Sequence, residues 1–252
     1  MKATVTAPDG VTIAYETTGE GMPVLLIHGF ASDHVQNWRA PGWYEPLTKA
    51  GYRVIAMDCR GHGDSDKPHD PAMYAHDIMA RDAIAVMDAE GLSAPAVMGY
   101  SMGGYLGMHL VMGHGARVSK LVIGGVGETY FSTAQFARDE IVAALEAPDA
   151  SAITDPIGRN FRAFAEQPGK DIKALAACMR GDRKSFTALQ LSAARQPVLV
   201  VCGDLDEMTG NPGPLAAAFA NGRAVTVPKR DHMTTVGDKL YKQAVLDFLA
   251  EG

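Results

Sequence analysis

Gly99-Tyr100-Ser101-Met102-Gly103-Gly104 follows a short apolar run, Pro95-Ala96-Val97-Met98, and opens a segment of helical character. A serine with glycines two residues to either side, at a junction of strand and helix, fits the G-x-S-x-G turn. The turn is so sharp that side chains at the glycine positions would collide with the neighbouring strand or helix. The pattern therefore predicts a strained backbone at Ser101, with its hydroxyl above the sheet and beside free N–H groups of the helix.

This motif alone does not decide whether the serine is a nucleophile. A short pattern with few fixed positions occurs by chance in many chains, and a glycine-rich turn can have a purely structural role. The choice between the two interpretations depends on the rest of the sequence.

Length and charge narrow the class of protein. The chain has 252 residues, 47% hydrophobic and 21% charged, which suits one α/β domain with a substantial core and is short for two. A net charge of -6 argues against a nucleic-acid-binding protein, because such a protein needs a basic face to neutralise phosphates. No segment has the character of a membrane span or a signal peptide, so we expect a cytoplasmic protein without a membrane partner. The cysteines lack metal-ligand spacing and are expected to be free thiols; they are Cys59, Cys178 and Cys202.

Apolar runs alternate with helical patterns along most of the chain. Residues 3–7 and 11–17 alternate apolar and polar around Asp9-Gly10, which predicts a β-hairpin. Apolar runs typical of buried strands occur at 23–27, 52–57, 95–99, 118–124 and 197–202, and a shorter strand is expected at 223–227. Helical spacing is found at 75–90, 102–113 and 236–250. The sequence therefore predicts an α/β fold, with a mostly parallel eight-stranded sheet and helices on both faces.

The segment between Gly125 and Pro197 lacks a convincing strand. Its apolar residues are spaced for several short helices, and prolines punctuate it at Pro148, Pro156 and Pro168. The segment is too small for an independent domain, but it has the size of a cap over an active site. We therefore expect a core of residues 1–127 and 193–252, with a small helical cap, residues 128–192, inserted in it.

A serine nucleophile needs a base, and the base needs a carboxylate that fixes its tautomer. His232 is the favoured base, because it lies in a loop between the strand 223–227 and the last helix. Such a loop belongs to the edge of the sheet where ligands bind in open α/β folds. The remaining histidines are explained by helical, polar or loop positions; among them are His34, His69, His76, His109 and His114.

Two carboxylates compete for the role of the acid. Asp204 and Asp206 both follow the apolar run that ends at Cys202. Either could instead form a turn or cap a helix, which are common roles for Asp after a strand. The position of the two residues leaves both open.

At this point the chain resembles the α/β-hydrolase fold superfamily, over nearly its whole length. The order Ser101, Asp206, His232 is the order of that superfamily's triad. Residues 27–30, Ile-His-Gly-Phe, resemble its His-Gly-x element, and residues 58–65, Asp-Cys-Arg-Gly-His-Gly-Asp-Ser, resemble its Asp-x-Arg-Gly-x-Gly-x-Ser loop. The segment from Gly203 to Asp206 fits the pattern Gly-x-x-Asp, in which the final Asp is the acid. The resemblance therefore selects Asp206 over Asp204.

The resemblance also implies an oxyanion hole, made by the backbone N–H groups of Phe30 and Met102. Such a pair typically lowers the barrier by a few kcal/mol. The resemblance further implies that His28, Arg60 and His62 brace loops. No metal or organic cofactor is implied. Relatives that cleave carbon–halogen bonds or epoxides use Asp at the elbow, so the serine argues against both chemistries.

Few residues are candidates for substrate contacts. Trp38, in the loop 31–38, could shape the pocket entrance or could pack in the interior. Tyr130 and Phe131, at the start of the expected cap, are further candidates. The phenylalanines of this region suggest either an apolar pocket lining or a cap packed against itself; they are Phe131, Phe136, Phe161 and Phe164.

These residues predict a serine hydrolase that cleaves a small carboxylic ester or lactone through an acyl-enzyme intermediate. Ser101 attacks the carbonyl, His232 transfers the proton, and Asp206 orients His232. The expected partner is the small-molecule substrate, and the sequence does not specify an oligomeric state. A C–C hydrolase of diketone ring-cleavage products, an acyltransferase and a cofactor-free perhydrolase are alternatives. A hydrolase-like ligand receptor or signalling protein with slow turnover is an alternative from a different class.

Overall fold

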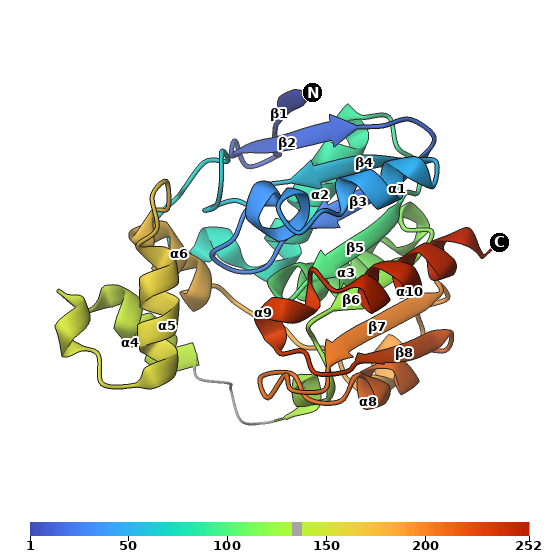
Figure 1. The fold of residues 1–252 in the computed structure, drawn as a ribbon. Helices are drawn as coiled ribbons and strands as arrows, with labels where there is room; N and C mark the ends of the chain where they lie inside the picture. Colours follow the sequence, from blue (N-terminus) through green and yellow to red (C-terminus); the bar gives the residue numbers. More distant parts are fainter. Residues whose placement is uncertain (133–137, 252) are drawn as a thin grey trace.

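The computed structural model describes residues 1–132 and 138–251, and an eight-stranded sheet runs through it (Figure 1). The strands follow the order β1-β2-β4-β3-β5-β6-β7-β8 across the sheet. β2 is antiparallel to both of its neighbours, and every other neighbouring pair is parallel. This confirms the predicted sheet. The strands are β1 (Lys2–Thr6), β2 (Thr12–Thr18), β3 (Met22–Ile27), β4 (Tyr52–Met57), β5 (Ala96–Tyr100), β6 (Leu121–Gly124), β7 (Val198–Gly203) and β8 (Gly222–Val227).

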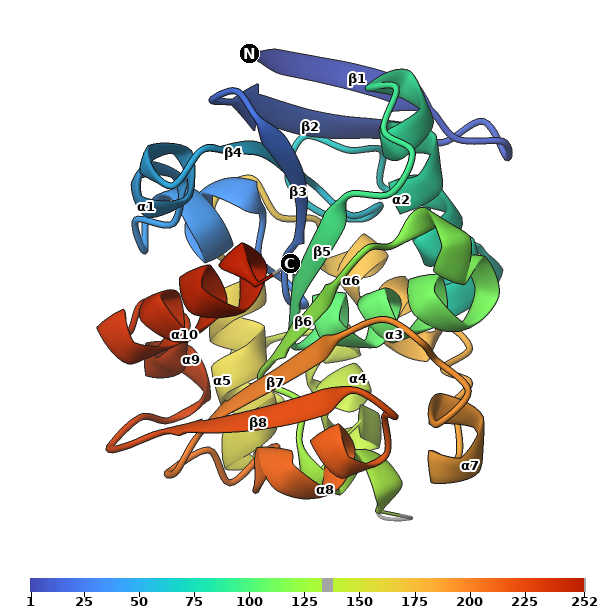
Figure 2. The ribbon, with the colours of Figure 1, turned by 90° about the vertical axis from the view of Figure 1, so that its right-hand side faces the viewer.

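Helices cover both faces of the sheet, as Figure 2 shows. One face carries α1 (Tyr44–Lys49) and α10 (Lys239–Ala250); the other carries α2 (His76–Ala89), α3 (Met102–His114) and α8 (Pro212–Ala217). Side chains of one strand alternate between two apolar clusters. Leu26 of β3 belongs to the cluster of α1 and α10, whereas Ile27 belongs to that of α2, α3 and α8. Burial on both faces explains why the strands read as continuous apolar runs.

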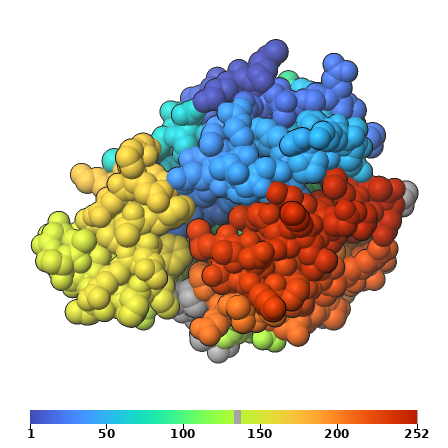
Figure 3. Space-filling view, in the orientation of Figure 1, coloured from blue at the N-terminus to red at the C-terminus, as the bar shows by residue number. Residues whose placement is uncertain are grey.

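Between β6 and β7 the chain forms a group of helices beside the sheet. They are α4 (Arg138–Glu146), α5 (Pro156–Ala165), α6 (Ile172–Arg180) and α7 (Ala188–Leu191). Figure 1 shows α4, α5 and α6 at the end toward which β7 points, and Figure 3 shows them as a lobe against the body of the molecule. The lobe has an apolar cluster of its own, in which Leu145, Leu175 and Met179 are buried.

Local signals explain where these inserted helices begin. The side chain of Asp155 accepts the N–H of Gly158, and Pro156 occupies the first turn of α5. Asp171 caps α6 by accepting the N–H of Ala174. Thr187 and Gln190 form a reciprocal capping box at α7.

Several short elements depart from the sequence predictions. The expected loop 31–38 contains a π-helix, Val35–Arg39, and neither α1 nor α8 was predicted, since each is too short to show a clear period. The expected last helix, 236–250, is α10, and a separate short helix, α9 (His232–Thr235), precedes it. Asp231 caps α9 and Asp238 caps α10, which divides the segment.

Two other expectations bear on buried residues. His76, expected in a polar or loop context, is buried and is the first residue of α2. Cys59, Cys178 and Cys202 are free and buried. Within residues 1–132 and 138–251, no helix is long and apolar enough to cross a membrane.

Candidate active site

Ser101 lies at a sharp turn between β5 and α3 and has a left-handed backbone conformation, with φ 51° and ψ -115°. A Cβ atom at Gly99 would lie 2.0 Å from the carbonyl oxygen of Gly103, and one at Gly103 would lie 2.0 Å from that of Ile27. Only glycine therefore fits at either position. A non-glycine residue held at positive φ is strained, which makes this serine a candidate functional residue.

Asp206 and His232 form a close pair after β7 and β8. Asp206 Oδ2 lies 2.8 Å from His232 Nδ1, and the Asp206 side chain is 0% exposed. The other carboxylate oxygen of Asp206 accepts the backbone N–H of Met208 at 3.2 Å. Asp204, by contrast, is exposed and accepts the backbone N–H of Arg230. Of the two candidate acids, the structure brings Asp206 to the histidine.

The structure also links the residue before the serine to the histidine. The phenol of Tyr100 donates a hydrogen bond to the carbonyl oxygen of His232 at 2.5 Å, and their rings are 5.5 Å apart. Sequence reasoning missed this contact. No local pattern predicts it, because it joins β5 to the start of α9.

Ser101 and His232 each contact the same short backbone segment, Gly124-Gly125. The N–H of Ser101 donates to the carbonyl oxygen of Gly124 at 2.7 Å. A Cβ at Gly125 would lie 2.9 Å from His232 Cε1. Gly125 has φ 63°, so glycine satisfies both the turn and the close approach of the imidazole.

The loop after β3 lies against the serine. A Cβ at Gly29 would be 3.4 Å from the Ser101 Cβ, and the N–H of Gly29 donates to Asn37 Oδ1 at 3.0 Å. In the part of the chain that the structure describes, the N–H groups of Phe30 and Met102 donate no hydrogen bond. Both amides are therefore available to a ligand at this turn.

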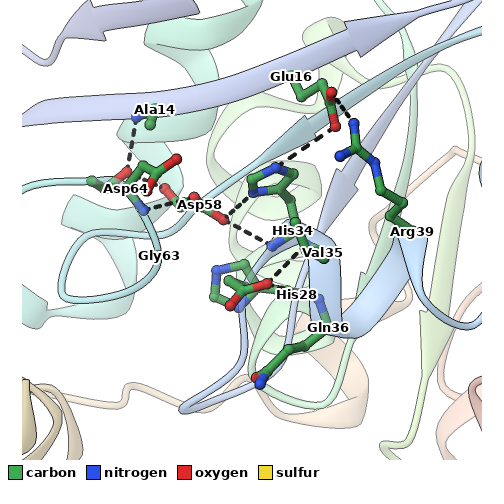
Figure 4. Close-up of polar contacts among 12 residues, drawn as sticks. Ala14, Glu16, His28, His34, Val35, Gln36, Arg39, Asp58, Gly63 and Asp64 are labelled. Atoms are coloured by element: carbon green, nitrogen blue, oxygen red, sulfur yellow. Dashed lines mark hydrogen bonds and ion pairs between the residues drawn. The ribbon is translucent and has the colours of Figure 1, made fainter. Parts of the chain in front are cut away.

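A buried polar network supports this loop (Figure 4). Asp58 Oδ1 accepts both the backbone N–H and the ring Nδ1–H of His34, each at 2.8 Å. His28 donates from Nδ1 to the carbonyl oxygen of Gly29 and accepts the N–H of Cys59 at Nε2. Burial lowers the pKa of His28, which favours the neutral ring that this pairing requires. These contacts tie the loop after β3 to the loop after β4.

Arg60 and His62 form hydrogen bonds that support the loop after β4. The Arg60 guanidinium bonds both oxygens of Asp82, at 2.7 and 2.6 Å, and reaches Asp9. His62 donates from Nδ1 to the carbonyl oxygen of Arg60 at 2.8 Å, and burial lowers its pKa to about 3. Neutral, buried His62 and paired Arg60 have the bracing contacts expected of them.

The candidate substrate contacts have different surroundings. Trp38 is fully buried in the π-helix against Trp43, with ring centroids 5.9 Å apart, so its contacts are those of interior packing. Tyr130 is buried, and its phenol oxygen accepts the N–H of Phe186 at 2.7 Å. Phe131 is 39% exposed and packs edge-on to Tyr130.

Two of the remaining phenylalanines pack within the lobe. Phe161 and Phe164 pack on the apolar cluster of the lobe, and Phe161 also lies 6.0 Å from Phe30, between ring centroids. Phe136 lies outside the described residues. The lobe thus packs partly on itself and partly on the loop after β3. Among the described residues, no group of His, Cys, Asp and Glu side chains is arranged to hold a metal ion.

Comparison with known proteins agrees with this fold. The sequence pattern of the family described as "alpha/beta hydrolase fold" matches residues 22–146. The chain belongs to the α/β-hydrolase fold superfamily. A superfamily protein named YisY, from Bacillus subtilis (strain 168), is 35% identical over 114 residues, which cover 45% of this chain and 41% of that protein.

Two further relatives of the superfamily are informative. A 2-hydroxymuconate semialdehyde hydrolase from Pseudomonas sp. (strain CF600) is 33% identical over 116 residues, covering 46% of this chain and 40% of the relative. The match thus spans less than half of either curated relative. A solved hydrolase from Pseudomonas aeruginosa PA01 has a TM-score of 0.83 and 26% identity, and the match covers 99% of this chain and 98% of that one.

Proposed function

We propose that this α/β-hydrolase-fold protein is a serine hydrolase that cleaves a small carboxylic ester or lactone. The observation that carries the proposal is the arrangement around Ser101. A strained serine at the start of α3 contacts the segment Gly124-Gly125, which His232 also approaches, and His232 pairs with buried Asp206 at 2.8 Å. A nucleophile, a base and an orienting carboxylate are the groups that acyl transfer requires.

In the proposed mechanism, Ser101 Oγ attacks the ester carbonyl while His232 Nε2 accepts its proton. Asp206 holds the Nδ1–H tautomer and stabilises the imidazolium that forms. The free N–H groups of Phe30 and Met102 bind the tetrahedral oxyanion, aided by the N-terminus of α3. His232 then protonates the leaving alcohol, and a water activated by the same imidazole hydrolyses the acyl-enzyme.

The helices between β6 and β7 are the proposed cap. They lie at the end toward which β7 points, beside the loop that bears Phe30, and Phe161 of α5 packs near Phe30. A lobe in this place limits which acyl groups reach the serine. We therefore keep residues 128–192 as the cap and residues 1–127 and 193–252 as the core.

A C–C hydrolase is the second candidate. It is favoured by one observation, the 33% identity to the 2-hydroxymuconate semialdehyde hydrolase. The same triad would serve it, because a carbon leaving group also needs protonation by the histidine. Turnover of diketone substrates relative to esters distinguishes the two reactions.

The test combines labelling with turnover. A fluorophosphonate probe should label the wild-type protein, and Ser101→Ala should abolish labelling and p-nitrophenyl ester hydrolysis without changing the melting temperature. The control is Ser192→Ala, an exposed serine that should leave both unchanged. Labelling that persists in Ser101→Ala refutes the nucleophile. Labelling without turnover of any ester, together with stabilisation by a ligand, would favour a receptor.

A further inference from the structure

Arg183 lies between α6 and α7 and has an unusual environment for a guanidinium. The side chain as a whole is partly exposed, but its Nε is buried and, among the described residues, has no hydrogen-bond partner. Its Nη2 contacts the thioether sulfur of Met179 at 3.0 Å, and a thioether is a weak acceptor. Among the described residues, Arg183 forms no ion pair, and the segment 133–137, Thr-Ala-Gln-Phe-Ala, contains no acidic side chain that could supply one.

The absence of a partner is costly. Burial lowers the pKa of Arg183, and the nearby guanidinium of Arg138 lowers it further. A guanidinium that is partly removed from water without a counter-charge loses part of its hydration, so such groups are normally paired. Two cations near one another without a carboxylate make a site that attracts an anion.

The backbone that carries Arg183 is held on both sides. Arg138 donates to the carbonyl oxygens of Met179 and Gly181, each at 2.8 Å. On the other side, the N–H of His76 donates to the carbonyl oxygen of Asp182 at 3.0 Å. These bonds hold the backbone next to Arg183 in place, which limits the positions open to its side chain and reduces the conformational cost of binding.

Its surroundings connect Arg183 to the proposed active site. Cys178 and Tyr105 lie near the Arg183 guanidinium, and both influence its pKa. Cys178 Sγ lies 3.9 Å from the sulfur of Met102, the residue that follows Ser101. Tyr105 lies one turn farther along α3, and its N–H donates to the carbonyl oxygen of Ser101 at 3.3 Å. Arg183 thus lies near Cys178 and Tyr105, which contact Met102 and Ser101 of the turn that bears the proposed nucleophile.

We propose that Arg183 binds a carboxylate on the acyl part of the substrate, and that Arg138 positions it. The substrate class is then the monoesters of short dicarboxylic acids, or lactones that carry a carboxylate. A guanidinium binds a carboxylate through two parallel N–H···O bonds, so an anionic substrate supplies the partner that the protein lacks. The inference rests on the proposed hydrolase function, because it assigns the acid part of that substrate.

The test compares two esters with acyl chains of equal length. Mono-p-nitrophenyl glutarate carries a terminal carboxylate, and p-nitrophenyl valerate does not. The wild-type protein should prefer the glutarate ester. Arg183→Gln should lower kcat/KM for the glutarate ester at least about tenfold, chiefly by raising KM, and should change the valerate ester less than about threefold. Arg183→Lys should restore part of the loss, because it keeps the charge.

The matched control is Arg180→Gln on the same segment. Arg180 is exposed and pairs with Glu146 at 2.5 Å, so its substitution should change the ratio of the kcat/KM values of the two esters little. If Arg183→Gln lowered kcat/KM equally for both esters, Arg183 would have a structural role, and the inference would be overturned. A wild-type protein that shows no preference for the glutarate ester would overturn it as well, even if Arg183→Gln does not fold.

A binding measurement separates this inference from the proposed function. If the wild-type protein hydrolyses neither ester, the hydrolase proposal fails, and calorimetric titration of glutarate then tests the site. Binding that weakens at least about tenfold in Arg183→Gln supports the anion site without catalysis. Equal affinity of both proteins for glutarate, or no binding by either, overturns it. Hydrolysis of both esters without dependence on Arg183 leaves the hydrolase proposal intact and rejects the anion site.

Discussion

His34 and Asp58 form a buried pair, with His34 Nδ1 2.8 Å from Asp58 Oδ1 and side chains 5% and 0% exposed. On the other side of the ring, Glu16 Oε2 lies 3.7 Å from Nε2, which is an ion-pair distance rather than a hydrogen bond (Figure 4). Glu16 in turn pairs with Arg39. The imidazole therefore lies between two carboxylates, and Asp33 adds a third negative charge nearby.

The Asp58 carboxylate should make stability depend on acid pH. Burial alone would raise its pKa, but the hydrogen bond from His34 and the neighbouring imidazoles of His28 and His34 lower it from 3.8 to about 2. The stabilisation is therefore present above the unfolded pKa and is lost as the pH falls from about 4 to about 2; it amounts to about 2 kcal/mol. Urea unfolding should show that the difference in the free energy of unfolding between wild type and Asp58→Asn becomes smaller over that range. A difference that stays constant would contradict the prediction.

The His34 imidazole should act in the opposite direction. Burial alone would lower its pKa, but the hydrogen bond to Asp58 and the charges of Asp58 and Glu16 raise it above 6.5. The stabilisation is complete below the unfolded pKa and is lost as the pH rises through the folded one. His34→Gln should therefore be most destabilising near about pH 6 and less so in alkali. Urea unfolding across this range measures the difference in the free energy of unfolding between wild type and His34→Gln. A difference that grows in alkali would contradict a charged His34 in the folded protein.

The choice of acid can be tested by two matched substitutions. Asp206→Asn keeps the shape of the side chain but favours the wrong tautomer of His232, so kcat/KM should fall by about 10³ to 10⁴-fold. Asp204→Asn should change it less than about threefold, because Asp204 is exposed and its bond among the described residues is to a backbone N–H. Ester hydrolysis at neutral pH measures both. Equal losses of kcat/KM, or a larger loss for Asp204→Asn, would show that Asp206 is not the acid.

Some parts of the fold and site were readable from the sequence because they have local causes. Strands such as β3 and β7 are buried on both faces, which requires continuous apolar residues. The turn at Ser101 requires small residues at fixed spacing, since Gly99 and Gly103 have no room for a Cβ atom. The position of His232 after a strand made it the favoured base, and the resemblance to the α/β-hydrolase superfamily selected Asp206 over Asp204.

Other parts depend on contacts between distant segments. Tyr100 bonds the carbonyl oxygen of His232 132 positions away, and no period or motif encodes that pair. The burial of Trp38 follows from its packing on Trp43 within a π-helix, an element without a clear sequence signal. The isolation of Arg183 is a property of what surrounds it. It becomes visible only once the neighbouring elements are in place.

The guanidinium of Arg60 should be among the most important single groups for stability. Its side chain is 1% exposed, as is that of its partner Asp82. Arg60→Met would leave the Asp82 carboxylate buried without a counter-charge, at a cost of about 3–5 kcal/mol in the free energy of unfolding. Arg60→Met combined with Asp82→Leu should recover part of that loss, because no buried charge remains.

The control for this pair is Arg81→Met. Arg81 forms an exposed ion pair with Asp77 at 3.3 Å, so its loss should cost less than about 1 kcal/mol. Urea unfolding measures the free energy of unfolding of these three variants and of the wild type. If the double variant were no more stable than Arg60→Met, the uncompensated charge would not be the cause of the loss.

Two glycines of α3 provide the last comparison. A Cβ at Gly103 would lie 2.0 Å from the backbone oxygen of Ile27, so Gly103→Ala can form only if α3 and β3 move apart. We expect a loss of more than about 2 kcal/mol and a marked drop in probe labelling of Ser101. Gly113 is exposed in the same helix, and its Cβ would meet nothing within 4 Å, so Gly113→Ala should stabilise the protein by about 0.5–1 kcal/mol. Thermal unfolding and probe labelling of both variants decide the matter. If Gly103→Ala were as stable and as readily labelled as Gly113→Ala, the close contact between β3 and α3 would not be what holds the serine in place.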